Sequence, residues 1–131
     1  MMGALKTFFC VLMLSLVPVI TAAPTFAAPR LDPLRVVATC AGRLSAQMEF
    51  QWMFDGSKAD ATKAVRASRI ELLAAMTPPG QAREVLSGRV EAKIAQAALL
   101  RRSMFNPDKR DARWAQRAAQ HKIGACRSLL L

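Results

Sequence analysis

Few side chains in this sequence could do chemistry. The 131 residues include three cysteines and one histidine, His121, whereas a zinc site usually needs four such ligands. The C-x-x-C spacing of redox-active thiols is absent, as are H-E-x-x-H and a glycine-rich phosphate loop. Glu49, Glu84 and Glu91 have no obvious partner residue with which to act as a general acid or base. These patterns indicate no metal ion and no cofactor, and they favour a binding protein over an enzyme.

Basic residues are the most conspicuous chemical feature. Lys and Arg outnumber Asp and Glu by 19 to 9, and the excess is concentrated from Arg89 onward. Arg110, Arg113 and Arg117 share one face of a predicted helix, and few basic residues here have an acidic residue four positions away. Arginine suits bidentate contact with phosphate or carboxylate. The full set of predicted contact residues is Lys109, Arg110, Arg113, Arg117, Arg101 and Arg102.

This basic face predicts an exported, non-enzymatic protein that binds a partner or an anionic envelope surface. An acidic protein is the other partner that fits. Nucleic acid is weakly supported, because Trp114 is the one aromatic residue among these arginines. The alternative is a solvated face that keeps a small protein soluble. The sequence does not indicate an oligomeric state.

Residues 1–27 have the pattern of a cleavable secretory signal peptide. A positively charged start precedes an apolar run over residues 7–20, and Thr25 and Ala27 are the small residues that signal peptidase requires. An uncleaved anchor is disfavoured, because the run is short for a span of roughly 20 residues. We therefore expect a mature domain of residues 28–131, periplasmic or secreted, without a transmembrane span.

Cys40 and Cys126 are the cysteines that remain after cleavage. An even pair in an oxidising compartment most simply forms a disulfide. Two unpaired buried thiols are the alternative. The predicted bridge joins the two ends of the mature chain.

Helix-capping and turn residues along the chain indicate four helices. Asp32 and Asn106 each precede a proline, which is typical of a helix cap followed by the first helical residue. The segments 55–57 and 77–80 contain turn residues. Because the connections are short, we expect an all-α, antiparallel four-helix bundle closed by one disulfide, with the first helix beside the last. The predicted helices span residues 33–54, 58–76, 79–104 and 107–129.

Apolar seams at helical spacing predict which side of each helix faces the core. The seam of the second helix is the weakest. The residues are Val37, Ala41, Leu44, Met48 and Trp52 in the first helix, Ala61, Val65, Leu72 and Met76 in the second, Leu86, Val90, Ile94 and Ala97 in the third, and Ala112, Ala115, Ala119, Ile123, Cys126 and Leu130 in the fourth.

The end of the first predicted helix is apolar on two sides. Trp52 belongs to the seam, whereas Phe50 and Phe54 project to the opposite side. A helix with two apolar faces is either covered on both or offers a patch to a partner. Both interpretations of Phe50 and Phe54 stay open.

Met48 and His121 suggest one cofactor hypothesis. Periplasmic four-helix cytochromes of the b562 type use a methionine on the first helix and a histidine on the last, and this chain resembles them in size and helix order. With Cys40 opposite Cys126, Met48 comes within about 4.5 Å of the level of His121 along the axis. However, His121 lies about 140° around its helix from Cys126, on the flank of the bundle. Because this position does not favour a buried ligand, haem binding is kept only as the alternative function.

The decapeptide C-A-G-R-L-S-A-Q-M-E at residues 40–49 and R-V-E-A-K at residues 89–93 resemble small exported bacterial helical proteins that have no assigned function. The similarity extends to Cys126. It implies an exported helical domain and supplies no active site. In physical terms, small side chains beside the predicted disulfide let another helix approach closely. These residues are Ala41, Gly42, Ser45 and Ala46.

Overall fold

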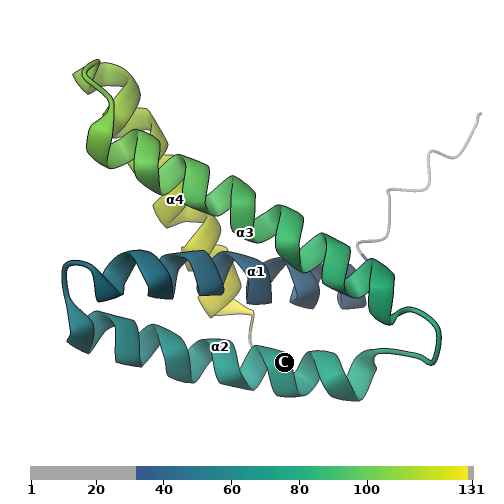
Figure 1. The fold of residues 1–131 in the computed structure, drawn as a ribbon. Helices are drawn as coiled ribbons and strands as arrows, with labels where there is room; N and C mark the ends of the chain where they lie inside the picture. The colour runs from purple at the N-terminus through teal and green to yellow at the C-terminus, as the bar shows by residue number, and fades with distance from the viewer. Residues whose placement is uncertain (1–31, 130–131) are drawn as a thin grey trace, which may run out of the picture.

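The computed structural model describes residues 32–129, and these form four α-helices without a strand (Figure 1). The helices are α1 (Pro33–Trp52), α2 (Gly56–Met76), α3 (Ala82–Phe105) and α4 (Lys109–Ser128). The predicted all-α class is confirmed, and every predicted helix lies within one turn of its actual bounds. The predicted signal peptide, residues 1–27, lies outside the described residues. Within the described range, no helix has the length and hydropathy needed to cross a membrane.

Carboxylates determine where three of the helices begin. Asp32, Asp55 and Asp108 each accept a hydrogen bond from a backbone amide two or three residues further on. Such a bond satisfies an amide that has no partner within the helix. Asn106, the predicted cap of the last helix, stands two residues before the actual cap and accepts a hydrogen bond from the Asp108 amide at 3.0 Å. The prediction of Asn106 as the cap is therefore wrong.

The cap at Asp55 gives α2 an expected acid dependence. Hydrogen bonds from the Ser57 hydroxyl and from Lys58 lower the pKa of Asp55 from 3.8 to about 2. Because the pKa is lower in the folded state, the ionised cap stabilises the fold above about pH 4, and this contribution is lost as the pH falls towards 2. An NMR titration of the Asp55 carboxyl should have its midpoint near pH 2, and Ser57→Ala should raise it. A midpoint near pH 4 in the unaltered protein would contradict this assignment.

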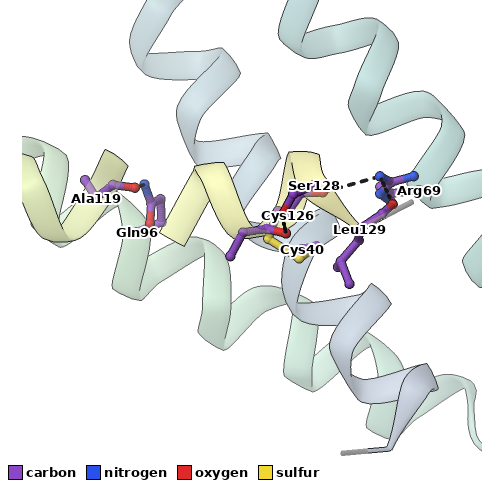
Figure 2. Close-up of a disulfide and its surroundings, with 8 residues drawn as sticks. Cys40, Arg69, Gln96, Ala119, Cys126, Ser128 and Leu129 are labelled. Atoms are coloured by element: carbon purple, nitrogen blue, oxygen red, sulfur yellow. Dashed lines mark hydrogen bonds between the residues drawn. A yellow bond between two sulfur atoms is a disulfide. The ribbon is translucent and has the colours of Figure 1, made fainter. Parts of the chain in front are cut away.

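α1 is the central helix. It packs against α2 on one side and α3 on the other, whereas α4 packs mainly on α3 and crosses α1 (Figure 1). The predicted disulfide between Cys40 and Cys126 is present at this crossing, with the two Cα atoms 5.3 Å apart (Figure 2). The first and last helices therefore meet around the disulfide. The helix that packs most extensively against α1 is α3, followed by α2.

Gly42 explains why α3 can lie so close to α1. A Cβ atom at this position would be 2.1 Å from the carbonyl oxygen of Arg89 and 3.1 Å from the Cβ of Ala92. The neighbouring small residues Ser45 and Ala46 are buried too. The small residues beside the disulfide therefore do admit another helix, as the sequence predicts, and that helix is α3.

The predicted seam of α4 is confirmed from Ala112 to Cys126, and Leu130 lies outside the described residues. The seam of α1 is confirmed except for Trp52, which is exposed because the helix ends there. On α2 the buried residues are Ala59, Thr62 and Leu73, and the predicted Ala61 is exposed.

The seam predicted for α3 is wrong. Leu86, Val90 and Ile94 are exposed, whereas Gln96 and Leu100 are buried. The reason is the contact at Gly42, which fixes α3 by the side that carries the Arg89 backbone and Ala92. The apolar stripe lies beside that side and stays exposed, with Leu86 and Val90 bordering a groove next to Gly42.

Candidate functional site

The four basic residues predicted on the last helix share the outer surface of α4. The cap at Asp108 fixes the start of the helix, and its buried alanines face inward. The side chains on the opposite side are therefore turned to solvent. None of these four forms an ion pair with another residue of the 32–129 range. The exposed residues are Lys109, Arg110, Arg113 and Arg117, with Arg101 exposed near the end of α3.

Arg102 has a different role from the other predicted contact residues. Its guanidinium forms a two-pronged ion pair with the Asp111 carboxylate and lies over the Trp114 ring, 5.1 Å from the centroid. This pairing lowers the pKa of Asp111 and raises the pKa of Arg102. Arg102 therefore ties the end of α3 to the first turns of α4, and its charge is already neutralised.

Sequence reasoning missed this pair for a simple reason. Arg102 and Asp111 are nine residues apart and lie on different helices, so a search at helical spacing does not find them. Asn106, in the turn between them, also donates a hydrogen bond to Asp111. The turn brings the three side chains together.

Apolar side chains are exposed at the same end of the molecule. The exposed fractions are 47% for Met104, 69% for Phe105 and 50% for Trp114. Met104 and Phe105 are not among the residues predicted to contact a partner. Their signal is their position directly before the Asn-Pro turn, where a helix ends and has few neighbours.

The predicted apolar patch at Phe50 and Phe54 is divided between two environments. The two rings are in contact, with centroids 5.0 Å apart. Phe50 is half-buried and lines a pocket of about 340 Å³ with Leu100 and Met104, so it lies towards α3 and α4. Phe54 is exposed beyond the end of α1.

The structure places the proposed haem ligands in different surroundings. Met48 is buried in the core, whereas His121 is exposed on α4. A haem ligand pair must face one shared cavity, so this placement does not favour haem binding. Ser45, which lies beside Met48 on α1, accepts a hydrogen bond from Arg66 at 2.7 Å and donates one to the Ala41 carbonyl. No group of three metal-ligating side chains occurs within residues 32–129.

Comparison with known proteins adds no assignment. No family model, curated protein or solved structure matches this chain.

Proposed function

We propose that this protein is exported and binds an anionic partner, without catalysis, through the basic face of α4. This basic face consists of Lys109, Arg110, Arg113 and Arg117. The proposal includes removal of residues 1–27 and folding of residues 28–131 as a four-helix bundle in the periplasm or outside the cell. The disulfide supports it, because such bonds persist in oxidising compartments.

The observation that carries the proposal is the lack of internal neutralisation around this face. The two nearest carboxylates are committed elsewhere, because Asp108 caps α4 and Asp111 pairs with Arg102. Other parts of the described chain place a lysine beside a carboxylate, as in Lys58 with Asp55 and Lys93 with Glu49.

Like charges at helical spacing cost stability, by a few tenths of a kcal/mol per pair. Arg113 and Arg117 have this spacing, as do Arg110 and Arg113. A bound anion would remove this repulsion and accept hydrogen bonds from the guanidinium groups. Phosphate and carboxylate fit them best, because arginine can bind either through two parallel hydrogen bonds.

The triple substitution Arg110→Gln, Arg113→Gln and Arg117→Gln should abolish most of the binding. Each basic residue near an anionic surface contributes about 1 kcal/mol, so three together are worth about 100-fold in affinity. All three side chains are exposed, so the fold should be unaffected. Binding to polyphosphate and to phosphatidylglycerol vesicles, at low and high salt, measures the effect.

A charge-matched control separates the basic face from net charge. Arg35→Gln, Lys63→Gln and Arg83→Gln remove three exposed charges from α1, α2 and α3, and should change affinity much less. Equal losses in the two triple variants would mean that only net charge matters. If the unaltered protein binds neither polyanion at low salt, the face is merely solvated and the proposal fails.

A further inference from the structure

The end of the α3–α4 hairpin combines apolar and basic side chains. Phe105 is the last residue of α3, and it is the most exposed large apolar side chain among the described residues. Met104 and Trp114 are also about half exposed. Figure 1 shows that this end projects beyond the layer formed by α1 and α2. Met104 also lines the pocket beside Phe50, whereas Phe105 stands at the very end of α3. We refer to Met104, Phe105 and Trp114 as the hairpin tip.

The basic face directly adjoins the hairpin tip. Trp114 is five residues from the start of α4, which is about 8 Å along the axis. At spacings of four and three residues, its neighbours on the helix surface are Arg110 and Arg117. Long arginine side chains can extend from an apolar layer to reach polar groups above it.

We propose that the anionic partner is a lipid bilayer with anionic headgroups, and that the hairpin tip enters its interface. This inference rests on the proposed function and specifies the partner. Phe105 and Met104 would reach the boundary of the acyl chains, with Trp114 at the level of the headgroups. The arginines of the basic face would bind the headgroup phosphates.

The combination of side chains favours a bilayer over other polyanions. An acidic protein segment or a polysaccharide would satisfy the arginines and leave Phe105 and Met104 in water. A bilayer presents an anionic layer above an apolar one, and amphipathic structures penetrate it by about 5–10 Å. Tryptophan is typical of such interfaces, and Trp114 is half exposed on the helix surface beside Arg110 and Arg117.

The acidic residues at this end do not oppose the approach. The carboxylate of Asp111 is neutralised by Arg102, whose guanidinium also covers the Trp114 ring. The Asp108 carboxylate accepts hydrogen bonds from the Arg110 and Asp111 amides at the positive end of the α4 dipole.

Trp114 provides a direct reporter. The chain has two tryptophans. Trp52→Phe changes an exposed side chain, and Trp114 is then the single tryptophan that emits. In this background, phosphatidylglycerol vesicles should shift the Trp114 emission to shorter wavelength, and brominated acyl chains should quench it.

Met104→Ser with Phe105→Ser should weaken vesicle binding about tenfold or more, remove the shift and leave polyphosphate binding unchanged. The matched control is Leu86→Ser with Ile94→Ser, which changes two similarly exposed apolar residues of α3 and should have no effect.

The outcomes separate this inference from the proposed function. If polyphosphate and vesicles both bind, but the Trp114 emission does not shift and the Met104 and Phe105 changes have no effect, the hairpin tip does not insert. That result overturns the bilayer inference and leaves the basic face as a polyanion site. If neither ligand binds, both proposals fall.

Discussion

Replacing Gly42 with alanine should destabilise the fold by about 3 kcal/mol or more, as overpacking against an immovable neighbour does. The added Cβ would lie 2.1 Å from the carbonyl oxygen and 3.0 Å from the carbonyl carbon of Arg89. These are backbone atoms of α3, so they cannot rotate away as a side chain can. The two helices would have to separate, and the packing between them would be lost.

The sign of this effect is what makes it informative. In an exposed helix interior, glycine to alanine stabilises by about 1 kcal/mol, because alanine restricts the unfolded chain and favours the helix. Helix propensity alone therefore predicts a more stable Gly42→Ala protein, whereas the contact with α3 predicts the opposite. Thermal or urea unfolding distinguishes the two.

Gly124→Ala is the matched control. Gly124 also lies within a helix, and within the described residues a Cβ there would meet no atom closer than 4 Å apart from its own stretch of helix backbone and its chain neighbours. This variant should be slightly stabilised, whereas Gly42→Ala should lose ten degrees or more in Tm, at about 4–8 °C per kcal/mol for a domain of this size. Equal unfolding temperatures for the two variants would show that α1 and α3 do not pack as described.

Gly42 also shows where sequence reasoning succeeded and where it failed. Capping carboxylates and turn residues predict the helices well, because those signals act within a few residues. The small residues beside Cys40 predict a close helix contact. What they cannot predict is which side of α3 makes it, because hydrophobic periodicity assumes that the apolar stripe faces the core. Here the backbone at Arg89 faces α1, and Leu86, Val90 and Ile94 are left outside.

Gln96 is the clearest case of a residue whose burial could not be predicted from its residue type. Its side chain is fully buried, and its amide donates a hydrogen bond to the Ala119 carbonyl at 3.3 Å (Figure 2). A glutamine in a helix is normally read as a surface residue. Its burial follows from the crossing of α3 and α4, which the sequence of either helix alone does not specify.

The candidate site likewise has features that could be predicted from the sequence and features that could not. The basic face could be predicted, because helical spacing alone puts Arg110, Arg113 and Arg117 on one side. The neutralisation of Arg102 could not, because it depends on the turn that returns Asp111 to the end of α3. The exposure of Phe105 could not either, since it depends on how far the hairpin extends past α1.

The end of α4 is held by two kinds of link, of which the disulfide is the stronger. Arg69, on α2, donates hydrogen bonds to the carbonyl oxygens of Cys126 at 3.3 Å and Leu129 at 2.8 Å (Figure 2). An arginine side chain that reaches the C-terminal end of a helix, here α4, satisfies carbonyls that have no partner within that helix. Arg127, near the end of α4, also donates a hydrogen bond to the Thr62 hydroxyl of α2 at 3.1 Å. Otherwise α4 packs mainly on α3, so these links join its end to α1 and α2.

Removing the disulfide, by Cys40→Ala with Cys126→Ala, should lower the free energy of unfolding by about 4 kcal/mol. The two cysteines are 86 positions apart, and in the chain-entropy model a loop of that length restricts the unfolded state by about this amount. Alanine is the suitable replacement, because both cysteines are buried and serine would place a hydroxyl in the core. A domain of this size is typically stable by about 5–15 kcal/mol, so the variant should still fold at low temperature.

Two measurements check this effect. Urea unfolding of the unaltered protein should become about as easy with a reductant as it is for the double variant, and the double variant should not respond to reductant. Hydrogen exchange in the variant should rise in all four helices for amides that exchange through global unfolding, because the unfolded chain is no longer restricted. It should rise most in the second half of α4, because that segment also loses its covalent link to α1. If the second half of α4 accelerates no more than the other helices, the disulfide does not specifically hold the end of α4.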